Sequence, residues 1–251
     1  MKINFRISTA LLFGLLFCLF FSCSKKGNLN NSESNGTVTD IDGNLYHIVN
    51  IGKQFWMVEN LKTTQYNDHS LIPLINDSSN FVKTASPAYC WFNDDISNKK
   101  TYGALYNWYT VNTDKLCPIG WHVPSVDDFS LLENYLIENG FNYDGTTSAN
   151  KIAKALASST WQYSTFGIGV IGNPDYQSYI NKSGFTALPG GNLNYEGHFI
   201  NIGQIGSWWT STEAVSRSEY ATYFYLSYDS DSIARSDFVK PDGHSVRCIK
   251  D

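Results

Sequence analysis

The chain has 251 residues, with 18 Lys and Arg against 23 Asp and Glu, and a formal net charge of −5 at pH 7. This acidic balance excludes nucleic acid and anionic membrane surfaces from the expected partners, because both attract clustered positive charge. Aromatic residues make up 15% of the chain. Together with abundant Asn, Ser and Gly, this composition is typical of a loop-rich extracytoplasmic domain and not of a helical cytosolic enzyme.

The N-terminus has the pattern of a targeting signal. Lys2 and Arg6 form a positive region before an apolar run that extends from Ile7 to Phe21, and Ser22-Cys23 follows this run directly. This end resembles the lipobox of bacterial lipoproteins, which implies cleavage after residue 22 and attachment of fatty acids such as palmitate at Cys23. An uncleaved membrane anchor is the alternative, although a membrane-spanning helix needs about 17–25 apolar residues.

Residues 23–36 are polar apart from Leu29, and they predict a flexible tether in front of a single domain, residues 37–251. The lipobox resemblance implies an outer-membrane lipoprotein of the bacterial cell envelope. Lys25 and Lys26 stand where related envelope lipoproteins carry an acidic signal for export to the surface. The sequence therefore leaves open whether the domain faces the periplasm or the exterior.

Three cysteines remain in the domain, namely Cys90, Cys117 and Cys248. An oxidising envelope favours one disulfide and one remaining thiol among three cysteines. We expect Cys117, which leads into a helix, to pair with Cys248, which lies in the last strand. Cys90 is then left unpaired.

Strands are predicted first in the domain. The hairpin turn Asp42-Gly43 leads into a strand from Leu45 to Ile51, and Gly52-Lys53 turns the chain into a second strand from Gln54 to Val58. Tyr89 to Phe92 is predicted as a short aromatic strand. These segments alternate with polar loops.

The middle of the chain predicts helices. Residues 126–138 form the clearest one, because Phe129, Leu132 and Leu136 make an apolar stripe, Ser125 and Asp128 make a capping box, and Gly140 ends it. Residues 149–157, with Ser148 as the cap, predict a second helix. The run 102–111 predicts a third helical segment and also fits a strand.

Short strands and long loops follow. Strands are predicted at Phe185–Leu188, Ser207–Thr210, Ala221–Ser227 and Ser245–Ile249, and residues 229–242 are predicted as polar turns. Two helices in the earlier part of the domain, followed by short strands and long loops, indicate an α+β domain.

Six motifs in a fixed order carry a family resemblance. They are DIDGNLYHIVNIGKQFWMVENLK, YGALYNWYTV, LCPIGWHVPS, SGFTALPGGNLNYEGHF, SWWTSTE and SVRCIKD. On these motifs the chain resembles the Fibrobacter succinogenes major paralogous domain, which is common in secreted and lipid-anchored bacterial proteins. The resemblance covers residues 39–251. It names no activity, and a fold by itself implies none.

A more distant resemblance implies a more specific fold. The capped helix start, a Gly-rich stretch before Trp, and the closing strand are similar to those of formylglycine-generating-enzyme-like domains. This similarity implies a C-type-lectin-like fold, with two helices, a twisted and mostly antiparallel sheet, and long loops. In this fold a Cys117–Cys248 bond would join the start of the helix to the last strand. The oxidase activity of such enzymes needs a pair of reactive cysteines near the C-terminus, and Cys248 has no such neighbour.

No motif predicts a catalytic or metal centre. The histidines are scattered without the spacing that places two metal ligands together, and we expect His122 to serve as a structural hydrogen-bond partner. Asp94-Asp95 and Asp229-Ser-Asp231-Ser232 offer oxygen ligands of the kind that calcium binds, but neither has the complete loop with six or more oxygens. We therefore expect no cofactor. The five histidines are His47, His69, His122, His198 and His244.

The remaining signal is a cluster of aromatic and polar residues late in the chain. Tyr, Trp, Ser and Asn on loops provide contact area and adaptable hydrogen bonds, and aromatic faces stack on sugar rings. One of the two adjacent tryptophans and about half of the tyrosines are expected in the core. The predicted ligand-binding residues are Tyr195, Trp208, Trp209, Tyr225, Tyr228 and Arg235, within a wider set that includes Asn192, Asn194, His198, Asn201, Tyr220 and Tyr223.

These observations predict a lipid-anchored envelope protein that binds a glycan or another protein without catalysis. One alternative is a polysaccharide-acting hydrolase or accessory enzyme, with carboxylates such as Glu59, Glu196 and Glu213 as candidates. Another is a structural envelope component with no soluble ligand.

Overall fold

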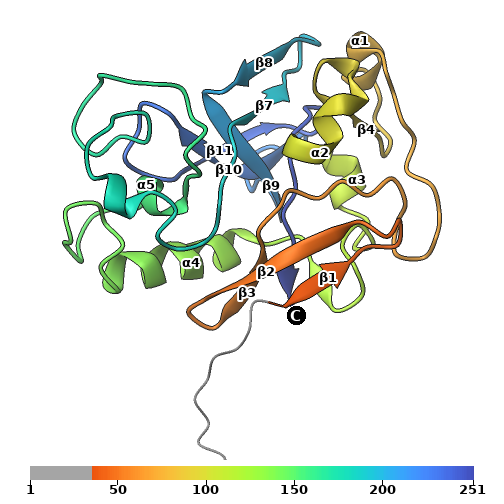
Figure 1. The fold of residues 1–251 in the computed structure, drawn as a ribbon. Coiled ribbons are helices and arrows are strands. Elements are labelled where there is room, and N and C mark those ends of the chain that lie inside the picture. Colours follow the sequence, from red (N-terminus) through yellow and green to blue (C-terminus); the bar gives the residue numbers. More distant parts are fainter. Residues whose placement is uncertain (1–35) are drawn as a thin grey trace, which may run out of the picture. The chain divides into compact units, whose positions relative to one another are not determined.

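A computed structural model describes residues 36–251 of the chain. The predicted leader and Cys23 lie outside these residues. The first five-stranded sheet has the order β1-β2-β3-β12-β6, and all its neighbouring strands are antiparallel. Its strands are β1 Thr37–Thr39, β2 Leu45–Ile51, β3 Gln54–Met57, β6 Trp121–His122 and β12 Ile249–Lys250. The predicted hairpin is confirmed as β2 and β3, and the end of the chain pairs beside it (Figure 1).

The second five-stranded sheet has the order β11-β10-β9-β7-β8, and a small third sheet pairs β4 with β5. Only the contact of β7 with β9 is parallel. The strands are β7 Gly190–Leu193, β8 Phe199–Ile202, β9 Ile205–Glu213, β10 Tyr220–Ser227, β11 Ala234–Val239, β4 Tyr89–Cys90 and β5 Leu105–Tyr106. The α+β class and the mostly antiparallel sheets are therefore confirmed.

Helix α4, Val126–Glu138, is the long helix of the described residues and matches the prediction. The Ser125 hydroxyl accepts from the Asp128 N–H, and the Asp128 carboxylate accepts from the Ser125 N–H, which completes the capping box. Phe129, Leu132 and Leu136 are buried in one cluster with residues of both five-stranded sheets, and Phe129 stacks on Phe224 of β10 at 4.4 Å between ring centroids. Gly140 follows with φ 74°, the left-handed conformation expected after a helix.

The other helical predictions were wrong in extent. Residues 102–111 split into the end of α2 (Lys99–Tyr102), strand β5 and the single turn α3 (Trp108–Val111), because Gly103 turns the chain at φ 77° and β5 pairs with β4. The predicted helix at 149–157 is reduced to α5 (Ala153–Leu156), which Ser148 does not cap. Further single turns are α1 (Ser78–Phe81), η1 (Phe92–Asp94), η2 (Ile96–Asn98) and η3 (Gln177–Tyr179).

Several strand boundaries also differ from the prediction. Residues 185–188 make only an isolated bridge through Ala187, and the strand starts later, as β7. The last strand pairs only over Ile249–Lys250, while Ser245 bridges to Trp208. The segment 229–242, predicted as turns, contains β11, because its backbone pairs with β10 along six residues. Tertiary pairing decided each of these cases.

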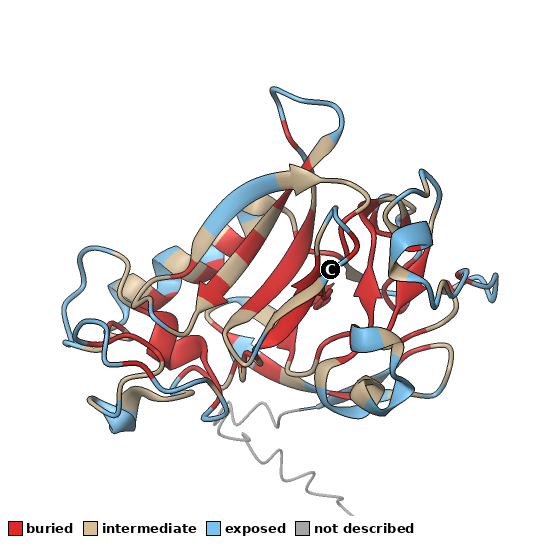
Figure 2. Ribbon diagram, turned by 90° about the horizontal axis from the view of Figure 1, so that it is seen from above, coloured by how far each residue is buried: buried red, intermediate tan, exposed pale blue. Residues whose placement is uncertain are grey.

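Two apolar clusters lie on opposite faces of β9 and β10. One contains Trp209 and residues from the first half of the chain, and the other contains Trp208 together with α4 and α5. Figure 2 shows the buried residues gathered in the central strands, with the exposed residues mostly on loops and outer surfaces. The predicted disulfide is confirmed between Cys117 and Cys248, whose Cα atoms are 6.0 Å apart, and Cys90 is buried and unpaired.

No helix within residues 36–251 combines the length and the apolar character needed to cross a membrane.

Candidate functional site

Trp208 and Trp209 are both core residues, with exposed fractions of 1% and 0%. The prediction that they contact a ligand was wrong. Strand β9 lies between β10 and β7 and is covered on both faces, so alternate side chains enter one cluster or the other. Trp208 Nε1 donates to Asn60 Oδ1, and Trp209 Nε1 donates to the Tyr106 carbonyl, each at 2.9 Å. No polar atom of either indole is left for a ligand.

An aromatic strip lies on the Trp209 side of the sheet. We define it by Tyr225, Tyr223, Phe238 and Tyr195, whose successive ring centroids are 5.6, 6.1 and 6.3 Å apart. Tyr223 and Tyr225 project from β10, and Phe238 projects from β11. Tyr195 is 57% exposed, and the other three are half-buried. The strip therefore presents ring surface to solvent while its base is packed into the core.

A tight turn between β7 and β8 holds Tyr195 at the end of the strip. Asn194 Oδ1 accepts from the N–H groups of Glu196 and His198, and Gly197 adopts φ 82°. The Glu196 carboxylate close to Tyr195 raises the pKa of the phenol. The predicted residues Tyr195 and Tyr225 thus belong to one surface. Phe238 was missed because its strand was predicted as turns.

A chain of buried polar side chains lies beneath the strip. Ser207 Oγ is 2.7 Å from His244 Nδ1, and His244 Nε2 is 4.0 Å from Asp242 Oδ2. The His244 ring lies between Trp209 and Tyr223, at 4.5 and 4.6 Å between centroids. Burial raises the pKa of Asp242 to about 8 and lowers the pKa of His244 to about 3. Both side chains are therefore mostly neutral at pH 7.

Serine, histidine and aspartate are the residue types of nucleophilic hydrolases. Here Ser207 and His244 are each only 2% exposed, so the Ser207 hydroxyl is closed to a substrate in this conformation. Sequence analysis missed this set, because the three residues lie on separate segments and no nucleophile motif surrounds Ser207. The signal that was present, His244 two residues after Asp242, is too common to identify a site.

Arg235 and Tyr228 lie apart from the aromatic strip. Arg235 is paired with Phe224 on the neighbouring strand, and this register directs it to the α4 side of the sheet. Tyr228 follows β10, where its N–H donates to the Gln204 carbonyl and its carbonyl accepts from the Gly172 N–H. The six predicted ligand residues therefore do not form one site. Of the wider set, Asn201 Nδ2 donates to Asn192 Oδ1.

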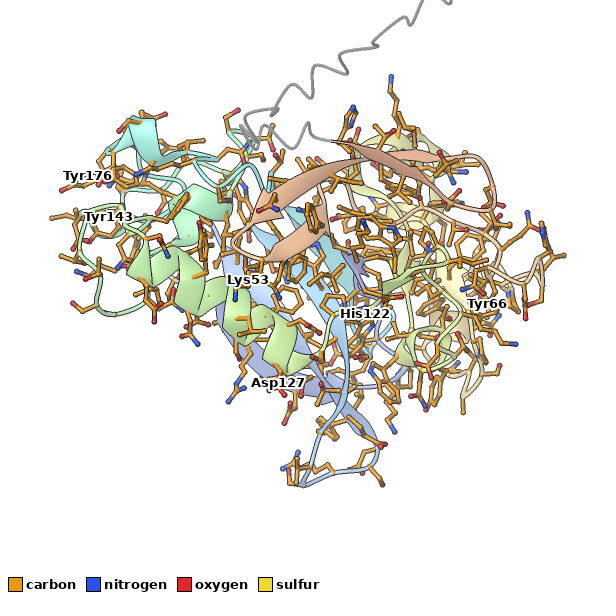
Figure 3. The ribbon with its side chains drawn as sticks, turned by 90° about the horizontal axis from the view of Figure 1, so that it is seen from below. Lys53, Tyr66, His122, Asp127, Tyr143 and Tyr176 are labelled. Atoms are coloured by element: carbon orange, nitrogen blue, oxygen red, sulfur yellow. A yellow bond between two sulfur atoms is a disulfide. The ribbon has the colours of Figure 1, made fainter. Side chains whose placement is uncertain are left out.

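The charged candidates are engaged in local contacts. His122 Nδ1 lies 2.6 Å from Asp251 and its Nε2 lies 3.4 Å from Asp128, which confirms its role as a structural hydrogen-bond partner (Figure 3). Glu59 pairs with His47, Glu196 with His198, and Glu213 with Lys240. Asp95 Oδ1 accepts from the Ser97 N–H, as in a solvated turn.

Within residues 36–251, no three side chains of His, Cys, Asp or Glu lie close enough together to hold a metal ion. Ser227 Oγ donates to Asp229, so the acidic turn that follows β10 has a local hydrogen bond of its own.

Comparison with protein families identifies the family of the domain. The family described as the Fibrobacter succinogenes major domain matches residues 49–250, which is most of the chain and nearly all of the described domain. Comparison with curated proteins and comparison with solved structures found no match. The family evidence thus rests on the sequence motifs that run from β2 to β12.

Proposed function

The chain belongs to the Fibrobacter succinogenes major domain family. From that premise we propose that it is a lipid-anchored protein of the bacterial cell envelope. We propose further that its domain binds a ligand without catalysis. The support for the anchor is the lipobox-like sequence at Cys23, behind an apolar run and ahead of a polar tether. An outer-membrane location is part of the proposal.

The ligand that the aromatic strip supports best is a glycan. Sugar rings offer C–H faces that pack on aromatic rings, and their hydroxyl groups need polar neighbours. The strip supplies four rings in a row, three of them on β10 and β11 and Tyr195 on the turn beside them, and Ser236 of β11 lies opposite Tyr223. Side chains held by a sheet lose little conformational freedom on binding. This row of partly exposed rings is the single observation that carries the proposal.

The fold proposal is C-type-lectin-like. Three features support it: the disulfide between the segment before β6 and the residue before β12, the mostly antiparallel sheets, and the position of the strip in the late part of the chain. In domains of that fold, the late loops and strands form the ligand surface.

Two other functions make different predictions. In the first, the domain binds a protein of the envelope in place of a glycan. In the second, the chain is a structural component of the envelope and binds no soluble ligand. A hydrolase is favoured by one observation, the Ser207–His244–Asp242 chain beneath the strip. Activity at this place requires Tyr223 to move aside, because its ring stacks on His244.

Binding to a glycan array tests the proposal. We expect the chain, purified without its leader and with Cys23→Ala, to bind a subset of glycans. Tyr195→Ala with Tyr225→Ala should lower the affinity at least about tenfold, since two of the four ring surfaces are lost. Tyr163→Ala removes a tyrosine that is 65% exposed on another loop, and this control should bind normally.

The outcomes separate the alternatives. Unchanged binding by the folded double variant contradicts the strip as the site, and no binding of any glycan favours a protein ligand or a structural role. Release of the acid from an O-acylated polysaccharide, with loss of that release in Ser207→Ala, supports the hydrolase, because a serine nucleophile of this kind attacks an ester carbonyl.

A further inference from the structure

Strand β11 has a free backbone edge. It is the last strand in the order β11-β10-β9-β7-β8. Its partner is β10, and within residues 36–251 no other group hydrogen-bonds to the backbone of Ala234 to Phe238. An edge strand directs the N–H and C=O groups of alternate residues outward, where another strand can pair with them. Residues 235–237 of this edge are also exposed as side chains.

Helix α4 runs alongside this edge and forms a groove with it. Near the start of the helix, Val126 and Asp127 share a hollow of about 610 Å³ with Ser236 and Asp237. Further along, Glu133 and neighbouring helix residues share a second hollow of about 400 Å³ with Ile233. Arg235 lines both hollows, so the two lie next to each other along β11. Figure 3 shows Asp127 on the first turn of α4, beside the strands of the second sheet.

The lining residues fix the direction of the groove. The helix advances from Val126 to Asn134 while the strand runs back from Asp237 to Ile233. Eight helical steps of 1.5 Å and four strand steps of about 3.3 Å both span about 12–13 Å. The helix and the strand therefore line the groove together over this length, which suits four residues of an extended peptide.

The charges of the groove are mostly negative. Asp127, Glu133 and Asp237 face one guanidinium, that of Arg235, while Glu213 at the margin is paired with Lys240. Phe224 and Ile233 give the groove an apolar floor. A peptide that fits has basic side chains on the groove side, where their aliphatic stems cover the floor and their charges reach the carboxylates.

We propose that a basic, extended peptide segment of a partner protein binds in this groove by adding a strand to the free edge of β11. Main-chain hydrogen bonds to β11 provide the pairing, and Lys or Arg side chains on the groove side meet Asp127, Glu133 and Asp237. This site lies on the α4 face of the sheet, opposite the aromatic strip, and is separate from the proposed glycan site. A second copy of β11 is a poorer occupant, because its Arg235 and Asp237 bring no net positive charge.

Binding of short peptides to the full-length chain in a mild detergent tests the proposal. The probes are an octapeptide of alternating Lys and Val, its Glu-Val counterpart, and a Lys-Val peptide with alternate backbone amides N-methylated. We expect the first to bind at least about tenfold more tightly than the other two, because only it has both the charge and the edge donors. Hydrogen exchange should slow in residues 233–239.

Variants locate the site on the protein. The double variant Asp127→Lys with Asp237→Lys should bind the Lys-Val peptide at least about tenfold more weakly. Asp229→Lys changes an exposed residue outside the groove, and it should alter the affinity for this peptide little. Equal binding of the N-methylated peptide, or unchanged exchange in β11, overturns the proposal. So does a dimer that protects β11 without any peptide. Glycan binding by the strip is measured separately, and its failure leaves this result intact.

Discussion

Asp242 is fully buried, and neither of its carboxylate oxygens has a hydrogen-bond partner within the described residues. Burial of this kind favours the neutral acid, and it raises the pKa of Asp242 to about 8. The neighbouring His244 responds in the opposite direction, because burial favours its neutral base and lowers its pKa to about 3. The two residues therefore give the stability of the domain a defined dependence on pH.

The sign of that dependence follows from proton linkage. The contribution of Asp242 is complete below its unfolded pKa of 3.8 and is lost as pH rises through 8. The contribution of His244 is complete above its unfolded pKa of 6.5 and is lost as pH falls through 3. Between about pH 4 and 6.5, the stability due to His244 rises with pH while the stability due to Asp242 falls, so the two effects oppose each other. Above pH 6.5 only the loss from Asp242 remains.

We therefore predict that the free energy of unfolding attributable to this pair falls between pH 6.5 and 8, by at most about 1.4 kcal/mol per pH unit. Asp242→Asn keeps the shape and cannot ionise, so it should flatten this slope. Urea unfolding at several pH values measures this slope in the wild-type protein and in Asp242→Asn. Asp229→Asn, on an exposed turn, should keep the wild-type slope. An unchanged slope in Asp242→Asn contradicts the assignment.

Single residues also explain why part of the predicted site was wrong. Trp, Tyr and Arg suit both a binding surface and a packed core, so residue type alone does not separate the two. Arg247 illustrates the core role: it is fully buried, it donates to the Phe185 carbonyl and to Asn60 Oδ1, and its guanidinium lies 4.2 Å from the Phe185 ring centroid. Its place in the closing motif is therefore structural.

At the scale of elements, α4 carries the most complete local signal in the chain. Its cap, its first-turn acids and its apolar stripe depend only on neighbours within eight residues, so they could be recognised before any tertiary contact was known. The same helix contacts the strands of both proposed sites. One face of it packs under β10, and another lines the groove beside β11.

The cap of α4 makes a prediction for stability. Ser125→Ala removes the acceptor for the Asp128 N–H and should lower the free energy of unfolding by about 0.5–2 kcal/mol. Ser130→Ala is the matched control, since its hydroxyl bonds the Val126 carbonyl inside the helix and Ala has the higher helix propensity. Chemical denaturation compares the two. Equal losses would mean that the cap has no special role.

Strand β11 shows the opposite situation at this scale. Its sequence, ARSDFV, has two charges and little β-propensity, and its exposure pattern is that of an edge. Only its register with β10 makes it a strand, and only its place at the end of the sheet leaves a free edge. Neither property is encoded within the segment itself.

At the scale of the whole molecule, the disulfide joins two segments separated by 131 residues. It joins the segment before β6 to the residue directly before β12, and these two strands are neighbours in the first sheet. Closing a loop of this length restricts the unfolded chain, and the entropy model gives this restriction a free energy of about 4–5 kcal/mol.

Loss of the disulfide should therefore lower stability. We predict that Cys117→Ala with Cys248→Ala reduces the free energy of unfolding by about 2–5 kcal/mol. Cys90→Ala removes a buried cysteine that has no bond, and it should cost less, since only packing is lost. Equal effects in the two variants, measured by urea unfolding without reductant, would assign the stability to packing alone.

The sequence by itself determined the family, the β2–β3 hairpin, the capped helix α4 and the Cys117–Cys248 pair, because each depends on ordered motifs or on interactions between near neighbours. Tertiary structure decided the surface. It buried both tryptophans by covering β9 on two faces, gathered Tyr195, Tyr223, Tyr225 and Phe238 into one strip, and sent Arg235 to the other side. The physical reason is that the exposure of a strand residue is set by which strands pair beside it and which layers cover it, and those partners lie far away in the chain.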